Sequence, residues 1–278
     1  MNFSKGKYYL LLMGVIAFTL ISCNKDDDNS TEEVNFSAEN TALVARVDNI
    51  VEGSQNIVEA GYSKTEESDR MPNDIFGNCA TFILNGGGSE GGTITIDFGT
   101  EGCQLLNAAT VTGKIFLEYG PLVSGTRSIT YEYQNFTYNG NGVAGGGTIT
   151  RVLENSEGFP QSTVNEDITV SIVGTTVTAE RTGLRVAEWI EGIGSGTWTD
   201  NVYRINGNWQ TTLSNGFERT GVVTIPLRRE MSCLFFVSGR IQVSQEGLTG
   251  ELDFGDGDCD AIATIIFQGQ EFPVILAN

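Results

Sequence analysis

From Cys79 to its end, the sequence alternates apolar and polar residues with a period of two. Thr93–Phe98 and Asp167–Ile172 are clear examples. Successive side chains of a strand point to opposite faces, so this pattern predicts strands with one buried face. Asn-Gly pairs at 85–86, 139–140, 206–207 and 215–216 are typical of tight hairpin turns. The sequence therefore predicts an all-β, mostly antiparallel meander of about 14 strands, and it leaves sandwich, open barrel and solenoid undecided.

One helix is expected ahead of the strands, near residues 38–60. Leu43, Val47 and Ile50 repeat at helical spacing, and Ser37 is suited to cap the helix N-terminus. Gly53 weakens the middle of this segment and marks the point where the helix could break.

Residues 1–22 have the pattern of a signal peptide. Lys5 and Lys7 precede an apolar run that is too short to span a bilayer. The run ends in Leu20-Ile21-Ser22-Cys23, which resembles the lipobox of bacterial lipoproteins. That resemblance implies diacylglycerol transfer to the Cys23 thiol, cleavage after Ser22, and a membrane partner held through lipid. The alternative is an ordinary signal peptide with a chance cysteine.

A short acidic stretch follows the cysteine. Lys25, Asp26, Asp27 and Asp28 resemble the surface-export signal of Bacteroidota lipoproteins, which implies an outer-membrane protein facing the exterior. The alternative is a solvated linker. We expect residues 23–36 to form an acylated, acidic tether and residues 37–278 to form a single β-rich domain with two related disulfide units.

Charge and composition exclude several kinds of chemistry. Acidic residues outnumber basic ones 35 to 16, and a net charge of −19 repels the phosphates of nucleic acid. The chain contains no histidine, which removes histidine-dependent triads and histidine-ligated zinc. We expect no nucleic-acid partner, no cofactor, no metal and no catalytic residues.

Four cysteines remain besides Cys23, and an internal repeat suggests how they pair. An even number of cysteines in an exported protein predicts disulfides. Asp97-Phe98-Gly99 lies between Cys79 and Cys103, and Asp253-Phe254-Gly255 lies between Cys233 and Cys259. Of three possible pairings, the repeat favours Cys79–Cys103 and Cys233–Cys259. A four-cysteine zinc site is the rival, but the closely spaced cysteine pairs typical of such sites are missing.

The double Cys…Asp-Phe-Gly…Cys pattern, the Asn-Gly turns and the lipobox together resemble a group of uncharacterised Bacteroidota surface lipoproteins. The most specific segment is Leu252-Asp253-Phe254-Gly255-Asp256-Gly257-Asp258-Cys259-Asp260. The resemblance covers most of residues 37–278. It supports the expected location and fold, and it carries over no functional residues.

Three short motifs suggest chemistry but are better explained by structure. Residues 140–145 match G-x-G-x-x-G, yet a strand pattern follows where a dinucleotide site needs a helix. Asp256, Asp258 and Asp260 alternate like calcium ligands, but the turn glycine and the later acid of a calcium loop are missing. Glu188 and Glu191 flank a tryptophan, but their spacing places them on opposite strand faces.

Aromatic residues are the remaining candidates for ligand contact. Tyr131 and Tyr133 share one strand face, whereas Phe136 and Tyr138 have the other parity. The candidates for ligand stacking are Tyr131, Tyr133, Trp198, Tyr203 and Trp209. If exposed, such rings stack on sugars, and if buried they fill a core. Core packing is the commoner role.

We therefore expect a non-enzymatic, lipid-anchored surface module that binds a glycan or an envelope protein, or serves a structural role. A second hypothesis is a carrier of a lipid or apolar ligand, which predicts an apolar cavity covered by the helix. A third is a carboxylate-based glycan hydrolase, which requires two acids that converge in one cleft.

Overall fold

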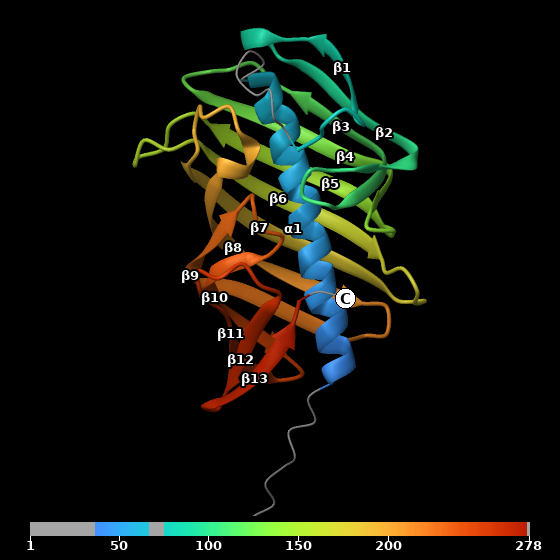
Figure 1. The fold of residues 1–278 in the computed structure, drawn as a ribbon, viewed down its shortest axis with the longest axis vertical. Coiled ribbons are helices and arrows are strands. Elements are labelled where there is room, and N and C mark those ends of the chain that lie inside the picture. Colours follow the sequence, from blue (N-terminus) through green and yellow to red (C-terminus); the bar gives the residue numbers. More distant parts are fainter. Residues whose placement is uncertain (1–36, 67–74, 277–278) are drawn as a thin grey trace, which may run out of the picture. The chain divides into compact units, whose positions relative to one another are not determined.

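The computed structural model describes residues 37–66 and 75–276. Within them, thirteen strands form one antiparallel sheet in which every strand pairs with its sequence neighbours (Figure 1). The elements are α1 (Ala38–Glu66), β1 (Thr81–Gly86), η1 (Gly88–Glu90), β2 (Gly92–Gln104), β3 (Thr110–Tyr119), β4 (Thr126–Tyr138), β5 (Asn141–Val152), β6 (Gln161–Ser171), β7 (Thr178–Glu191), η2 (Trp198–Asp200), β8 (Val202–Leu213), β9 (Glu218–Glu230), β10 (Phe236–Gln245), β11 (Leu248–Asp256), β12 (Ile262–Phe267) and β13 (Gln270–Ile275). The all-β meander with one N-terminal helix is confirmed, and the sheet is open because β1 and β13 are its two edges.

The predicted hairpin at Asn206-Gly207 is wrong, because β8 runs straight through these residues. The register between β8 and β9 shifts between Ile205 and Asn208, so this Asn-Gly pair forms a bulge. A Cβ on Gly207 would lie 2.0 Å from the backbone oxygen of Leu184, so only glycine fits there. Asn139-Gly140, by contrast, is the expected turn between β4 and β5, with φ of 49° and 77°.

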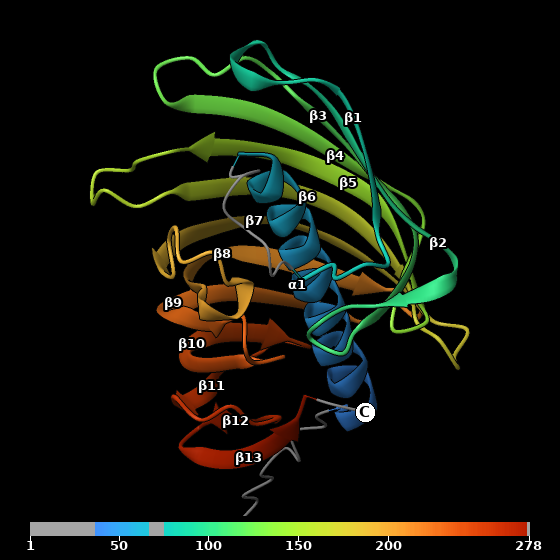
Figure 2. The same ribbon diagram turned by 45° about the horizontal axis from the view of Figure 1, so that its top comes forward.

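The helix α1 lies along the concave side of the curled sheet (Figures 1 and 2). Its N-terminal part contacts β10 through Thr41 and Gln245, and its C-terminal part contacts β1 through Lys64 and Phe82. Most residues from Val44 to Tyr62 of the helix are buried, as expected for a helix covered on most sides. Ser37 caps it as predicted, since its Oγ accepts a hydrogen bond from the backbone N–H of Asn40.

Gly53 does not break the helix but lets it approach the sheet. A Cβ at position 53 would lie 2.4 Å from the Tyr138 ring on β4. At Gly61 the corresponding contact is 2.3 Å from the terminal Cδ1 of Ile96, the end of a flexible side chain. The two glycines therefore differ in how easily the neighbouring side chain can move away.

This difference gives a paired prediction. Gly53→Ala adds helix propensity of about 1 kcal/mol, but it forces the methyl group into a buried ring, and such overpacking costs about 1–3 kcal/mol. We expect Gly53→Ala to lower the free energy of unfolding in urea, whereas Gly61→Ala leaves it near or above the wild-type value. Equal effects of the two substitutions would contradict the close packing at Tyr138.

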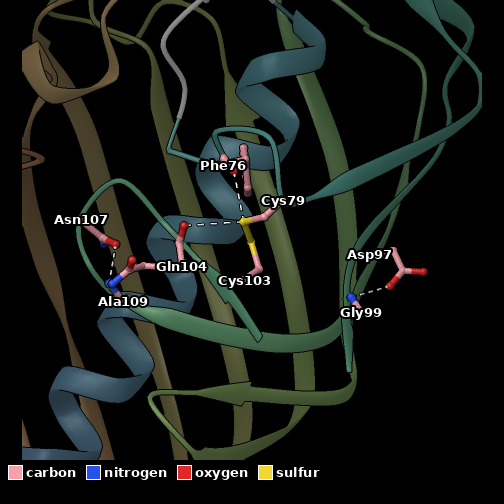
Figure 3. Close-up of a disulfide and its surroundings, with 8 residues drawn as sticks. All are labelled: Phe76, Cys79, Asp97, Gly99, Cys103, Gln104, Asn107 and Ala109. Carbon is pink, nitrogen blue, oxygen red and sulfur yellow. Dashed lines mark hydrogen bonds between the residues drawn. A yellow bond between two sulfur atoms is a disulfide. The ribbon is translucent and has the colours of Figure 1, made fainter. Parts of the chain in front are cut away.

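Both predicted disulfides are present. Cys79–Cys103 and Cys233–Cys259 span 24 and 26 residues, with Cα–Cα distances of 5.3 and 5.7 Å. Figure 3 shows the first, with the Cys79 Sγ close to the backbone oxygens of Phe76 and Gln104. In the chain-entropy model each loop of this size stabilises the fold by about 3 kcal/mol.

The repeated Asp-Phe-Gly tripeptide has a structural role in both units. The Asp97 carboxylate accepts a hydrogen bond of 2.9 Å from the N–H of Gly99, as drawn in Figure 3, and Asp253 does the same for Gly255. Each aspartate also pairs with a cation on a neighbouring strand, Lys114 or Arg240. The lysine and the Gly99 N–H lower the pKa of Asp97. The phenylalanine of each tripeptide is buried in the core.

Candidate functional site

The predicted lipidation residue Cys23 and the predicted export residues Lys25, Asp26, Asp27 and Asp28 lie outside the described residues. In the described part of the chain, no helix is both long and apolar enough to span a membrane. The same residues contain no group of three or more cysteine or acidic side chains that could hold a metal ion.

The expected exposed patch of aromatic side chains does not form. Tyr131, Tyr133, Trp198 and Tyr203 are all buried, and only Trp209 is partly exposed. The prediction that Tyr133 and Phe136 face opposite sides is also wrong. The β4–β5 register shifts between these two residues, and Asn135 has a φ of 50°. This bulge returns Phe136 to the same face, where its ring stacks on Tyr133 with centroids 5.1 Å apart.

The glycine-rich motif has the structural role expected of it. Residues 140–145 form a glycine-rich hairpin and strand. The prediction that Glu188 and Glu191 lie on opposite strand faces is wrong, because the β7–β8 register shifts between Trp189 and Glu191 and restores Glu191 to the face of Glu188. The two acids pair with Arg204 and Arg228, which are direct partners on β8 and β9.

A row of polar side chains on α1 faces arginines from the sheet. Asp48, Glu52, Gln55 and Glu59 recur at helical spacing along one side of the helix. Glu52 receives two hydrogen bonds from Arg185 on β7, at 2.9 and 2.8 Å. This side of the helix would be read from the sequence as solvent-facing, yet in the structure it is packed against the sheet.

Three further ion pairs, made by two arginines, extend this network. Arg181 on β7 lies between two carboxylates, with its Nε 2.7 Å from Glu166 and its Nη1 bonded to Asp48. Arg151 on β5 pairs with Glu59 at 3.4 Å. Each buried arginine of these pairs therefore faces at least one carboxylate.

The ion pair between Glu52 and Arg185 holds both groups in their charged forms. Burial by itself would raise the pKa of Glu52, but the adjacent Arg185 guanidinium outweighs this effect and the pKa is lowered overall. Burial likewise disfavours a charged Arg185, but Glu52 holds the pKa of Arg185 above its usual value. A carboxylate in this state is a poor proton donor at neutral pH, because general-acid catalysis needs a raised pKa.

Beside the network lies a cavity of about 60 Å³ between α1 and strands β7–β11. Ala45 of the helix lines it, together with apolar residues from each of these strands, among them Leu184, Ile205, Leu227, Ile241 and Leu252. Its polar groups come from Asp48, Asn49 and Glu52 of the helix, Glu166 of β6, Arg181 and Arg185 of β7, and Asn206 of β8. Mostly apolar walls with a few converging polar groups are typical of small-molecule sites.

Trp209 lines the same cavity and owes its position to two glycines. Gly183 on β7 and Gly221 on β9 are its direct partners on the neighbouring strands. A Cβ at Gly183 or Gly221 would lie 2.8 or 2.7 Å from Trp209 atoms. The guanidinium of Arg181 lies 4.6 Å from the centre of the indole ring, a cation–π distance. Of the five predicted stacking residues, Trp209 is therefore the one that lies at a candidate site.

The segment between β9 and β10 lines the cavity on another side. Leu234 is 40% exposed and Phe235 follows it, and both line the cavity. The buried Arg229 donates hydrogen bonds from Nη1 to the backbone oxygens of Cys233 and Phe235, the latter at 2.9 Å. The Cys233–Cys259 disulfide fixes the same segment from the β11–β12 side.

Comparison with known proteins gives no assignment: no family model, no curated protein and no solved structure matches this chain.

Proposed function

We propose that the protein is a non-enzymatic, lipid-anchored module of the cell envelope that binds an apolar ligand in the cavity between α1 and β7–β11. The observation that carries this proposal is the cavity itself. Its apolar walls include residues of five consecutive strands and of the helix, and it adjoins charged groups whose own partners hold them in place. An apolar group that enters such a space gains free energy from leaving water.

The burial of the aromatic side chains favours an apolar ligand over a glycan. Tyr131, Tyr133, Trp198 and Tyr203 have no free ring face for a sugar. The cavity instead matches the requirement of the carrier hypothesis, an apolar space covered by the helix. An envelope protein as a second partner stays a prediction.

The carboxylates argue against hydrolysis. Asp48, Glu52 and Glu166 converge on one cavity, as a glycan hydrolase would require, but each is paired with an arginine. A hydrolase needs one protonated and one free carboxylate across the scissile bond. None of these three carboxylates is free, because each is bonded to an arginine.

The proposed location rests on the sequence. Acylation of Cys23 would anchor the chain to the outer membrane, and Lys25 with Asp26–Asp28 would direct it to the exterior. Placed there, the cavity would bind acyl chains or other apolar molecules at the envelope surface.

A matched pair of helix variants tests the proposed binding. Ala45 lines the cavity and Ala42, on the same helix, is exposed. Both variants, Ala45→Leu and Ala42→Leu, keep a good helix former, but only the first fills the cavity. We expect the wild type and Ala42→Leu to bind the neutral probe N-phenyl-1-naphthylamine, with a rise in its fluorescence, and Ala45→Leu to bind about tenfold more weakly or not at all.

Thermal melting curves of both variants serve as the control that each is folded. No binding by the wild type, or equal binding by Ala45→Leu, would overturn the proposed function.

A further inference from the structure

Next to the cavity, three buried polar side chains form a row across strands β8, β9 and β10. Thr211 lies opposite Arg219, and Arg219 lies opposite Gln245. All three are buried, and Arg219 is only 1% exposed. We call these three residues the Arg219 row.

The Arg219 row has hydrogen-bonding groups that the described residues leave unsatisfied. They are Oγ1 of Thr211, Nε and Nη2 of Arg219, and Oε1 of Gln245. A buried polar group without a partner costs about 1–3 kcal/mol, and more if it is charged. The row thus combines an incompletely bonded cation with polar neighbours at its sides.

Arg219 is also an incompletely compensated charge close to the cavity. Its Nη2 lies 3.7 Å from Asp48, a carboxylate that already binds Arg181. Burial lowers the pKa of Arg219 and the neighbouring Arg181 adds to this effect, while Asp48 only partly opposes it. For Arg181 the carboxylates prevail and the pKa is raised. An additional hydrogen-bond acceptor near Arg219 would therefore complete the compensation of its charge, which Asp48 provides only in part.

The row adjoins the cavity through two of the residues that line it. Asp48 connects Arg219 to the cavity from the helix side. Trp209 lies two residues before Thr211 on the same strand face, and its buried Nε1–H also lacks an acceptor among the described residues. Trp209 lines the cavity itself and Arg219 lies behind Asp48, so the unsatisfied donors of both residues lie on the side of the cavity that Asp48 and Trp209 form.

We propose that the ligand is an amphiphile with an anionic oxygen head group, whose chain fills the apolar cavity and whose head group binds Arg219 with Thr211 and Trp209. This inference rests on the proposed function and specifies its ligand class. The shared chemistry is an oxygen anion at the end of an alkyl chain, carboxylate or phosphate.

Four ligands of equal chain length test the head group: octanoate, octyl phosphate, octanol and octylamine. We expect octanoate or octyl phosphate to displace N-phenyl-1-naphthylamine at a concentration about tenfold or more below that of octanol, since a charge-assisted hydrogen bond contributes this much. Octylamine is expected to be the weakest, because Arg219 would repel it.

Two variants locate the head group. Arg219→Leu is expected to abolish the preference for the anion, so that octanoate and octyl phosphate bind no more tightly than octanol. Arg240→Leu removes a partly exposed cation from β10 that pairs with Asp253, and we expect it to keep the preference. Melting curves establish that each variant is folded, and if Arg219→Leu does not fold, the wild-type ranking of the four ligands decides alone.

The outcomes separate the two proposals. If octanol and the probe bind but the anions have no advantage, the head-group inference fails and the proposed function stands. A preference for octylamine, or an anion preference that persists in Arg219→Leu, also overturns the inference. If none of the ligands and no probe binds, both proposals fall.

Discussion

Replacing Arg185 by leucine is expected to lower the free energy of unfolding by about 3–5 kcal/mol. The substitution leaves Glu52 buried beneath the sheet without the two hydrogen bonds that now hold its charge. Removing one partner of a buried ion pair costs this much because the other charge stays desolvated. Urea denaturation measures the change directly.

Two variants serve as controls: one removes both partners of the buried ion pair, and the other breaks an ion pair at the surface. The double variant Glu52→Leu/Arg185→Leu is expected to recover most of the loss, since apolar pairs often replace buried ion pairs without cost. Arg228→Leu breaks the pair with Glu191, both partners of which are at least one-third exposed, and should cost about 1 kcal/mol or less. A cost for Arg185→Leu as small as that for Arg228→Leu would mean that the helix network is not buried in solution.

Alkaline unfolding is the second large expected effect. Burial, the main cause in each case, raises the pKa of Tyr62, Tyr131, Tyr133 and Tyr138 above the ordinary value of 10.0. The folded state therefore keeps these protons where the unfolded state loses them. Their contribution to stability is complete below pH 10 and is lost as the pH rises toward the folded-state values.

The slope of this loss is steep. Each tyrosine that ionises only on unfolding lowers the free energy of unfolding by about 1.4 kcal/mol per pH unit, so four tyrosines lower it by about 5 kcal/mol per pH unit. We expect tyrosinate absorbance and loss of the circular dichroism signal to rise together in one cooperative transition above pH 10. Tyr133→Phe, which removes a hydroxyl without a partner among the described residues, should shift that transition to higher pH. Gradual ionisation at pH 10 in a folded protein would contradict the burial of these rings.

The strand pattern made most of the fold predictable. Alternation at Thr93–Phe98 and the Asn139-Gly140 turn predicted strands and a hairpin that the structure has. Alternation alone could not separate a sandwich from one open sheet, because both bury one face of each strand. The bulges at Asn135 and Gly207 could not be predicted. A bulge reverses the alternation of side chains along its strand, but asparagine and glycine occur in bulges and in turns alike, so the sequence does not separate the two.

The candidate site was harder to predict than the fold. Cavity-lining Trp209 was identified, but for a surface role it does not have. The arginines at 181, 185 and 219 were overlooked because charged residues are expected to face solvent. A usable signal existed, since Asp48, Glu52 and Glu59 form an acidic row on the helix and arginines occupy inward-facing positions of the strands. Matching the two requires knowing that α1 lies against the concave face, which no local pattern shows.

Binding of an apolar chain beside Trp209 is the central claim, and tryptophan fluorescence tests it most directly. Trp209 is the partly exposed tryptophan that lines the cavity, whereas Trp189 and Trp198 are buried elsewhere. Titration with 1-bromooctane, whose bromine quenches indoles on contact, is predicted to quench the wild type in a saturable way and to leave the remaining emission of Trp209→Phe unchanged. Absence of saturable quenching in the wild type, or equal quenching in Trp209→Phe, would contradict the account.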